Sequence, residues 1–247
     1  MPNLDSCLEI AKSATLLAGN FLKEQQDTNL KILKNKARDL KLQIDIDAEE
    51  IIKEHITANS SLPILAEESG KSGSLDDFFW VVDPLDGTSN FLRNIPISCV
   101  SIALVQGFKP ILGAIFDFNN SDLYFAHKNS KAFVNKSEIN VSLINFKKDS
   151  TLVTGIPAKD NYSDNEFSSM ISDFQSWKKV RMIGSAAMAS IYVAAGKAEA
   201  YKENGIFLWD IAAGAAIVEA AGGKVSICNH QSDFRVDAYF TNNNLEK

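Results

Sequence analysis

The strongest constraint on how this chain can fold is the stretch 80–91, which reads Trp-Val-Val-Asp-Pro-Leu-Asp-Gly-Thr-Ser-Asn-Phe. Residues 78–82 form a short apolar and aromatic run that is typical of a buried strand, and two acids, Asp83 and Asp86, follow it closely. Pro84 fixes its own φ and has no amide donor, so we expect a sharp turn that brings the two carboxylates together. Two carboxylates at such a short distance repel each other unless a cation lies between them, so the stretch predicts a metal site.

The residues that follow Asp86 suit an anion. Gly87 allows the backbone to approach a ligand closely, and the sequence 88–90 is typical of the N-cap of a short helix that Pro96 would end. A helix N-terminus favours anions, so a cation site beside it would hold a metal-bound phosphate ester. The alternative is an ordinary surface turn, because Asp-Pro-x-Asp-Gly also contains the residue types that turns require.

Composition narrows the class of protein. With 247 residues and 45% hydrophobic content the chain can bury a sizeable core, as one domain over 1–247 or as two closely packed lobes, roughly 1–140 and 141–247. The net charge of −6 argues against general nucleic-acid binding, which usually needs a basic face. The three cysteines are odd in number and far apart, so we expect buried free thiols. The sequence has no apolar run suited to export or to crossing a membrane, and we expect a cytoplasmic protein.

The hydrophobic pattern predicts most of the elements. Residues 4–22 repeat at steps of four and three, which indicates an amphipathic helix, and a second helix begins at Asp45. Between Lys31 and Lys41 five cations surround one acid, which indicates either a solvated loop or a flap over a phosphate. We also expect strands over 64–66, 97–118 (a hairpin), 123–126, 132–141, 152–155, 180–183, 224–228 and 237–241, and helices over 165–177, 184–195 and 210–221.

Further acids come from two distant segments. The strand 64–66 leads directly into Glu67 and Glu68, and Asp210 heads an alanine-rich helix. Asp210 has a simple structural alternative, because Asp is a common N-cap residue, and the acids within 45–50 would ordinarily complement the dipole of the second helix. An ordinary turn at residues 83–87 would not need more acids from elsewhere in the chain. We therefore expect these side chains to meet at one site.

Taken together, three segments resemble the inositol monophosphatase family, the magnesium-dependent, lithium-sensitive sugar-phosphatase group. They are 64–69 (Ile-Leu-Ala-Glu-Glu-Ser), 83–91 (Asp-Pro-Leu-Asp-Gly-Thr-Ser-Asn-Phe), and 209–214 (Trp-Asp-Ile-Ala-Ala-Gly) with 219–223 (Glu-Ala-Ala-Gly-Gly). The resemblance covers essentially the whole chain in the right order. It implies an α+β fold, a layered α-β-α-β-α sandwich, and a homodimer as the functional unit.

The resemblance also implies a set of metal ligands. Glu67, Asp83 and the backbone carbonyl of Leu85 match the ligands of a first Mg²⁺, and Asp83, Asp86 and Asp210 match those of a second. A weaker third ion would share Glu67, so two or three Mg²⁺ are implied per site.

Other matched positions concern water and substrate. Asp45 and Thr88 match the pair that orients and activates the attacking water, and Glu68 matches a supporting acid. The amides of Gly87 and Thr88 match the phosphate cradle. The positions that match contacts to polyol hydroxyls are Gly184, Ser185, Ala186 and Glu203.

The sequence departs from the family pattern at one position near Asp45. Family members commonly have Asp-x-x-Thr-x-x-Asp here, whereas residues 39–45 read Asp-Leu-Lys-Leu-Gln-Ile-Asp, with Leu42 in place of Thr. The change removes a hydroxyl that would support Asp45, but it removes no metal ligand.

The resemblance implies a phosphomonoesterase that hydrolyses myo-inositol 1-phosphate or a similar polyol phosphate by attack of a metal-activated water. Within the superfamily the rival substrates are fructose-1,6-bisphosphate and 3′-phosphoadenosine 5′-phosphate. Glu203 favours neutral hydroxyls, whereas the basic segment 31–41 could receive a second anion. A function of another class is a transcription-complex or RNA-associated partner, as in some bacterial relatives.

Overall fold

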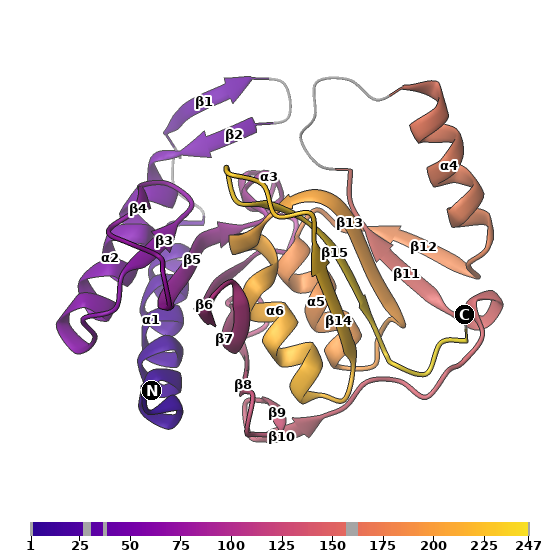
Figure 1. Ribbon diagram of the computed structural model, residues 1–247. Helices are drawn as coiled ribbons and strands as arrows, with labels where there is room; N and C mark the ends of the chain where they lie inside the picture. Colours follow the sequence, from indigo (N-terminus) through magenta and orange to yellow (C-terminus); the bar gives the residue numbers. More distant parts are fainter. Residues whose placement is uncertain (1, 27–30, 37–38, 157–162, 247) are drawn as a thin grey trace.

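The computed structural model describes residues 2–26, 31–36, 39–156 and 163–246 (Figure 1). The helices in this part of the chain are α1 Leu4–Gln25, α2 Gln43–Asn59, α3 Thr88–Leu92, α4 Asp164–Gln175, α5 Ala186–Ala194 and α6 Leu208–Ala220, with a 3-10 turn at Lys147–Asp149. The strands are β1 Ile32–Lys36, β2 Asp39–Leu42, β3 Ile64–Ala66, β4 Gly70–Lys71, β5 Phe78–Asp86, β6 Cys99–Gln106, β7 Lys109–Asp117, β8 Asp122–His127, β9 Ala132–Val134, β10 Ser137–Ile139, β11 Thr151–Thr154, β12 Lys179–Met182, β13 Ala200–Phe207, β14 Lys224–Cys228 and β15 Arg235–Thr241.

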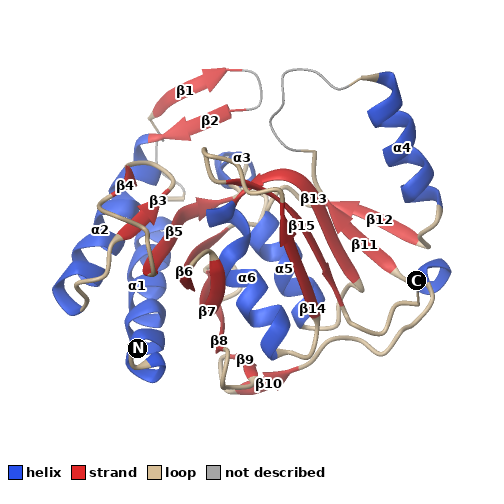
Figure 2. Cartoon of the chain, viewed as in Figure 1, coloured by secondary structure: helices blue, strands red, loops and turns tan. Residues whose placement is uncertain are grey.

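Two sheets carry the architecture. The larger sheet has the strand order β10-β9-β8-β7-β6-β5-β3-β4, and the smaller one has the order β12-β11-β13-β15-β14. Helices α1 and α2 cover one face of the larger sheet, α5 and α6 lie between the two sheets, and α4 lies outside the smaller sheet (Figures 1 and 2). This arrangement confirms the predicted layered α-β-α-β-α fold. The division into one domain or two lobes stays a prediction.

The alternation of side chains along the strands decides where the acids point. Phe79 and Val81 of β5, and Leu65 of β3, belong to the core that contains α5 and α6. The residues between them pack against α1 and α2 on the opposite face. Continued by two residues, the same alternation turns Asp83 and Glu67 towards α5 and α6.

The pairing of these strands sets the two acids side by side. Strands β3 and β5 are parallel neighbours, with Ala66 opposite Val82. The amide of Glu67 then donates a hydrogen bond to the Val82 carbonyl oxygen at 3.1 Å. Because the carboxyl ends of parallel strands meet at one edge, Glu67 and Asp83 leave the sheet together.

Small residues let α6 lie deep between the sheets. A Cβ added to Gly113 of β7 would lie 2.2 Å from the carbonyl oxygen of Ala213, so the helix backbone rests directly on this strand. A Cβ added to Gly214 would lie 2.3 Å from Cβ of Ser190 on α5. The two central helices therefore touch each other and the sheet at positions that have no side chain, as close packing requires.

The structure corrects the predicted turn at Pro84. Strand β5 continues through Pro84 to Asp86, and its pairing with β6 shifts register between Asp83 and Asp86. A bulge accommodates the proline without ending the strand, and it still changes the direction in which the second acid points. The predicted N-cap at residues 88–90 is also wrong. Gly87, with φ of 89°, is the N-cap of the five-residue helix α3.

The basic segment 31–41 was predicted to be either a solvated loop or a flap. Its described part forms an antiparallel pair of strands, β1 with β2, and so is not a loop, while residues 37–38 lie outside the described residues. The flap alternative stays a prediction. Among the free cysteines, Cys7 and Cys99 are buried as expected, but Cys228 is exposed on β14. None of the described helices has the length and apolar character needed to cross a membrane.

Candidate active site

Four carboxyl groups from separate elements influence one another at one end of β3 and β5. They belong to Glu67, Asp83, Asp86 and Asp210, and the charge of Asp86 raises the pKa of the other three. Asp83 is the most enclosed, with 1% of its surface exposed. Burial first, and then the charges of Glu67, Asp86 and Asp210, raise its pKa well above the ordinary value.

Glu67 lies at the outer side of this group. The residue is exposed, but its carboxyl lies against the other acids and shares a hydrogen bond with Asp83. Desolvation, followed by the charges of Glu68 and Asp45, raises the pKa of Glu67 to about 8. These acids repel one another when all are ionised, which is the condition that a dication would relieve.

Asp86 is tied to the start of α5. Its Oδ2 accepts hydrogen bonds from the Ser185 hydroxyl at 2.5 Å and from the Ala187 amide at 2.7 Å. Burial raises the pKa of Asp86 to about 6, and these hydrogen bonds oppose the shift. The Ser185 hydroxyl also accepts from the Met188 amide, so this side chain joins Asp86 to the helix. A contact from Ser185 to substrate stays a prediction.

Asp210 comes from α6 but is not its N-cap. It is the third residue of the helix, and its Oδ2 accepts from the amide of Phe207, the N-cap residue, at 3.2 Å. Burial, with the charges of Glu67 and Asp86, raises the pKa of Asp210 well above its ordinary value. Asp210 therefore has both of the roles that the sequence left open: it accepts from a backbone amide at the start of the helix, and it belongs to the acid group.

A cavity of about 420 Å³ adjoins these acids and is lined by the residues expected to contact polyol hydroxyls, but not by Gly87 or Thr88, which were expected to hold the phosphate. Glu203 is 9% exposed, and its Oε2 accepts a hydrogen bond from the Tyr201 hydroxyl at 3.1 Å. Burial raises the pKa of Glu203 to about 7. The site residues that line this cavity are Asp86, Gly184, Ser185, Ala186, Glu203 and Asp210.

Asn90 connects the two halves of the cavity wall. Its side-chain amide donates to the carbonyl oxygens of Ile97 and Ile183, each at 2.8 Å. Gly184, with φ of 75°, lies so close to Asn90 that an added Cβ would be 3.0 Å from its Nδ2. This bridge holds the turn before α5 against the segment that follows β5.

Asp45 and Thr88 both lie at the site, on separate supports. Asp45 is 3% exposed, its Oδ2 accepts from the Leu42 amide at 2.7 Å, and its charge raises the pKa of Glu67. The Thr88 hydroxyl donates to the Leu85 carbonyl oxygen at 3.0 Å. Leu42 is fully buried, so an aliphatic side chain in the core occupies the position where family members have a hydroxyl.

Sequence reasoning missed Glu49, which supports the acid pair 67–68. Glu49 is 2% exposed, its Oε2 accepts from the Glu68 amide at 2.8 Å, and Lys53 lies 3.8 Å from its other oxygen. The signal was available, because Glu49 follows Asp45 by four residues and so shares its face of α2.

Glu49→Ala is expected to weaken the binding of Mg²⁺ to the acid group by about 10- to 100-fold, the usual effect of losing a group that holds a metal ligand in place. The turn that carries Glu67 would lose its anchor at the Glu68 amide. Titration of thermal stability with Mg²⁺ measures this shift. The matched control is Glu50→Ala, an exposed neighbour on the same helix. Equal metal dependence in the two variants would show that Glu49 has no such role.

The donor chemistry fits hard cations, although the side chains are not closed around an ion. Within the described residues, no three His, Cys, Asp or Glu side chains have the geometry of a metal site as they stand. The mutual effects on pKa nevertheless place the four carboxyls within electrostatic reach of one another. Buried carboxylates with a nearby backbone carbonyl are the ligands that Mg²⁺ prefers.

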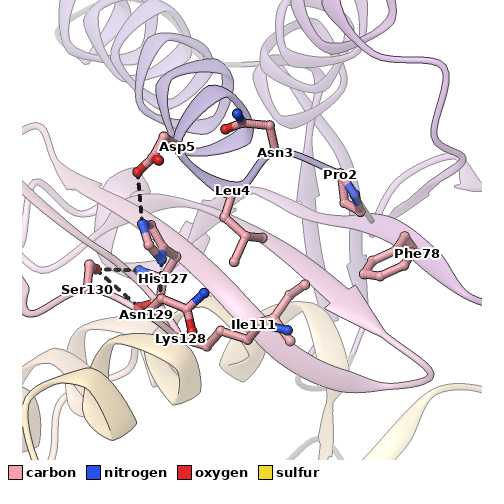
Figure 3. Close-up of a pocket in the computed structure, with 10 residues that line it drawn as sticks. All are labelled: Pro2, Asn3, Leu4, Asp5, Phe78, Ile111, His127, Lys128, Asn129 and Ser130. Carbon is pink, nitrogen blue, oxygen red and sulfur yellow. Dashed lines mark hydrogen bonds and ion pairs between the residues drawn. The ribbon is translucent and has the colours of Figure 1, made fainter.

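A different cavity, of about 540 Å³, lies at the N-terminal end of α1 (Figure 3). There the His127 ring accepts at Nδ1 from the Asn129 amide, so its Nε2 carries the proton that bonds Asp5 at 3.1 Å. This pair joins α1 to β8. Asp5 is the only acid among the described residues that line this cavity, so the described part of the cavity wall does not form a second group of carboxylates.

The fold and the acid group together define a class, the layered α/β proteins in which carboxylates from several segments meet at the carboxyl end of a sheet beside a polar cavity. The sequence pattern of the inositol monophosphatase family matches residues 3–246. The chain belongs to the inositol monophosphatase family, and it is an inositol-phosphate phosphatase by that membership.

Individual relatives agree with this assignment. The chain is 40% identical over 233 residues to an inositol-1-monophosphatase of Synechocystis sp., which covers 91% of this chain and 79% of the relative. It is 36% identical to a protein of Xylella fastidiosa named Nus factor SuhB, over 88% of this chain and 80% of the relative. The structure of the inositol monophosphatase from Anabaena (Nostoc) sp. superposes with a TM-score of 0.84 at 33% identity, covering 98% of this chain and 92% of that one.

Proposed function

We propose that this protein is a Mg²⁺-dependent phosphomonoesterase that hydrolyses myo-inositol 1-phosphate or a similar polyol phosphate. The observation that supports this most is the group of four carboxyls, from β3, β5 and α6, at the edge of a cavity that a buried glutamate also lines. Phosphate monoesters hydrolyse extremely slowly in water, so a site of this kind must stabilise a large development of charge.

The ligands follow the family match. Glu67, Asp83 and the Leu85 carbonyl would hold one Mg²⁺, and Asp83, Asp86 and Asp210 would hold another, with a third ion sharing Glu67. The Leu85 carbonyl has two lone pairs, so its hydrogen bond from Thr88 leaves one for a cation. Bound Mg²⁺ would supply charge stabilisation at the attacking and leaving oxygens and lower the pKa of a coordinated water.

The other residues act on water and substrate. Asp45 and Thr88 orient the attacking water, and Glu68 supports the ligand beside it. The amides of Gly87 and Thr88 receive phosphate oxygens, for which the left-handed φ of Gly87 suits the backbone. Glu203 accepts hydrogen bonds from substrate hydroxyls, because an ionised carboxylate is an acceptor only.

The test is phosphate release by the purified protein from myo-inositol 1-phosphate, fructose-1,6-bisphosphate and 3′-phosphoadenosine 5′-phosphate, with Mg²⁺ and with EDTA. We expect the inositol ester to have the highest kcat/KM and EDTA to abolish release. Preference for either bisphosphorylated substrate would contradict the substrate assignment. Release that is equal in EDTA would contradict metal dependence.

A second candidate function is a role in a transcription complex, because several relatives carry the name Nus factor SuhB. The expected result is that RNA polymerase does not retain this protein, in line with its acidic net charge of −6. If RNA polymerase binds wild type and Asp83→Asn equally, the second function exists and is independent of catalysis.

Three further expectations belong to this proposal. Assembly as a homodimer and inhibition by Li⁺ follow from the family, and a cytoplasmic location follows from the sequence, which has no apolar run suited to export. Light scattering on the eluting protein measures the first, and phosphate release at rising Li⁺ concentration measures the second. Fractionation of cells measures the third.

A further inference from the structure

A second cavity opens behind Glu203. It has a volume of about 550 Å³ and lies between α4 and the strands β13 and β15. It shares Thr154, Gly155 and Glu203 with the cavity beside the acids, so the two spaces adjoin at these residues, which we call the neck. We call the space beyond the neck the outer chamber.

The neck depends on a residue without a side chain. A Cβ added to Gly155 would lie 2.5 Å from Oε2 of Glu203, so only glycine leaves this carboxylate in its place. The Tyr201 hydroxyl also donates a hydrogen bond to the Glu203 carboxylate and helps to fix its position. One carboxylate therefore lines both the inner cavity and the outer chamber.

The wall that α4 provides is mixed. Glu166, Ser169 and Asp173 line the chamber together with Met170 and Phe174. No residue of α4 is fully buried, so its polar side chains on this side remain open to a ligand. The Lys202 ammonium on β13 bonds Asp173 at 2.9 Å and so sets the distance between strand and helix.

The charges of the chamber select its ligand. Among the described residues that line the chamber, both cations are engaged within the chain: Lys202 by Asp173, and Arg235 by Asp233 at 3.6 Å and by the ring of Phe207. Within the same set of residues the acids outnumber the cations, so a second phosphate would be repelled, whereas carboxylates readily accept hydrogen bonds from hydroxyls. The acids in question are Glu166, Asp173, Glu203 and Asp237.

We propose that the outer chamber is a subsite for an uncharged, hydroxylated ring attached to the phosphorylated polyol, so that the protein accepts glycosylated polyol or disaccharide monophosphates. This inference rests on the proposed phosphatase function and narrows its substrate class. The inner cavity of about 420 Å³ receives the ring that bears the phosphate, and the chamber receives the second ring.

The experiment compares two esters that differ by one neutral glucosyl ring, glucose 6-phosphate and trehalose 6-phosphate. In wild type the disaccharide ester is expected to have the higher kcat/KM, by about tenfold, through a lower KM. Ser169→Trp and Met170→Trp fill the chamber from two positions on α4 and remove this advantage, while kcat/KM for glucose 6-phosphate stays unchanged. Ser168→Trp, on an exposed face of the same helix, is the matched control.

Each outcome decides. The subsite proposal is wrong if wild type has equal kcat/KM for the two esters, or if Ser168→Trp loses the advantage of the disaccharide ester as fully as the chamber-filling variants do. In either case, hydrolysis of myo-inositol 1-phosphate would leave the proposed phosphatase function intact. If no ester is hydrolysed, the proposed function fails, and the chamber is then tested by calorimetric binding of trehalose itself. Binding to wild type that both chamber-filling variants abolish supports the subsite, and absence of binding to wild type overturns it.

Discussion

Asp83→Asn is expected to lower kcat/KM for phosphate release by about a thousandfold or more, beyond the effect of losing a single transition-state hydrogen bond. Asp83 is the one side chain proposed to contact both cations, and it is 1% exposed. The substitution preserves shape, and the asparagine oxygen can still accept from the Leu85 amide, as Oδ1 of Asp83 does at 3.0 Å. The loss would therefore reflect charge and not local misfolding.

The same variant is expected to be more stable than wild type in EDTA. Removing one buried charge relieves the repulsion from Glu67, Asp86 and Asp210 that raises the pKa of Asp83. Thermal unfolding measures this, with Asp76→Asn, an exposed acid, as control. A variant that loses activity and also loses stability in EDTA would show that Asp83 mainly supports the fold.

In the absence of divalent cations, the melting temperature of the wild-type protein is expected to fall by roughly 5 to 10 °C between about pH 5 and pH 8, given that about 1 kcal/mol corresponds to 2–4 °C in a chain of this size. The sign follows from linkage. The pKa of Asp86 rises on folding from 3.8 to about 6, and that of Glu67 from 4.5 to about 8. The folded chain thus binds more protons than the unfolded chain over this window, and stability decreases as pH rises.

Mg²⁺ is expected to reverse this trend. At 100 times its dissociation constant a ligand that binds only the folded chain adds about 2.7 kcal/mol, and protonated carboxyls bind it poorly. The gain in melting temperature on adding Mg²⁺ should therefore be large at pH 8 and small at pH 5. Glu67 contributes less to the pH dependence of stability than its pKa alone suggests, because the residue is exposed and its charge is screened by solvent. A gain that does not depend on pH would argue against carboxylate ligands.

The sequence indicated where the acid group lies because acids follow directly after apolar strands. Asp83 and Asp86 follow one such run, and side-chain alternation along the strands is enough to say that Asp83 and Glu67 share a face. Asp210, in the sequence-distant α6, could be expected near them, but its role as a metal ligand came only from the family resemblance, since an aspartate at a helix start has an ordinary explanation.

Other features could not be read from the sequence, because tertiary context decides them. Pro84 usually ends a strand, but a shift in the pairing with β6 lets β5 continue past it. Glu49 resembles any acid in a helical first turn until the Glu68 amide is seen to donate to it. The hydroxyl of Ser185 was matched to substrate, whereas its partners in the structure are Asp86 and the Met188 amide.

The absence of a side chain at Gly113 has a consequence for a residue on another element. Because the backbone of α6 lies directly on β7, the distance between them sets how far the first turn of the helix reaches towards β5, which belongs to the same sheet as β7. A methyl group added at Gly113 would push the helix away from the strand, and the Asp210 carboxylate in its first turn would move with it. The distance between the Asp210 carboxylate and the acids on β3 and β5 is thus set by a strand that contributes no residue to the acid group.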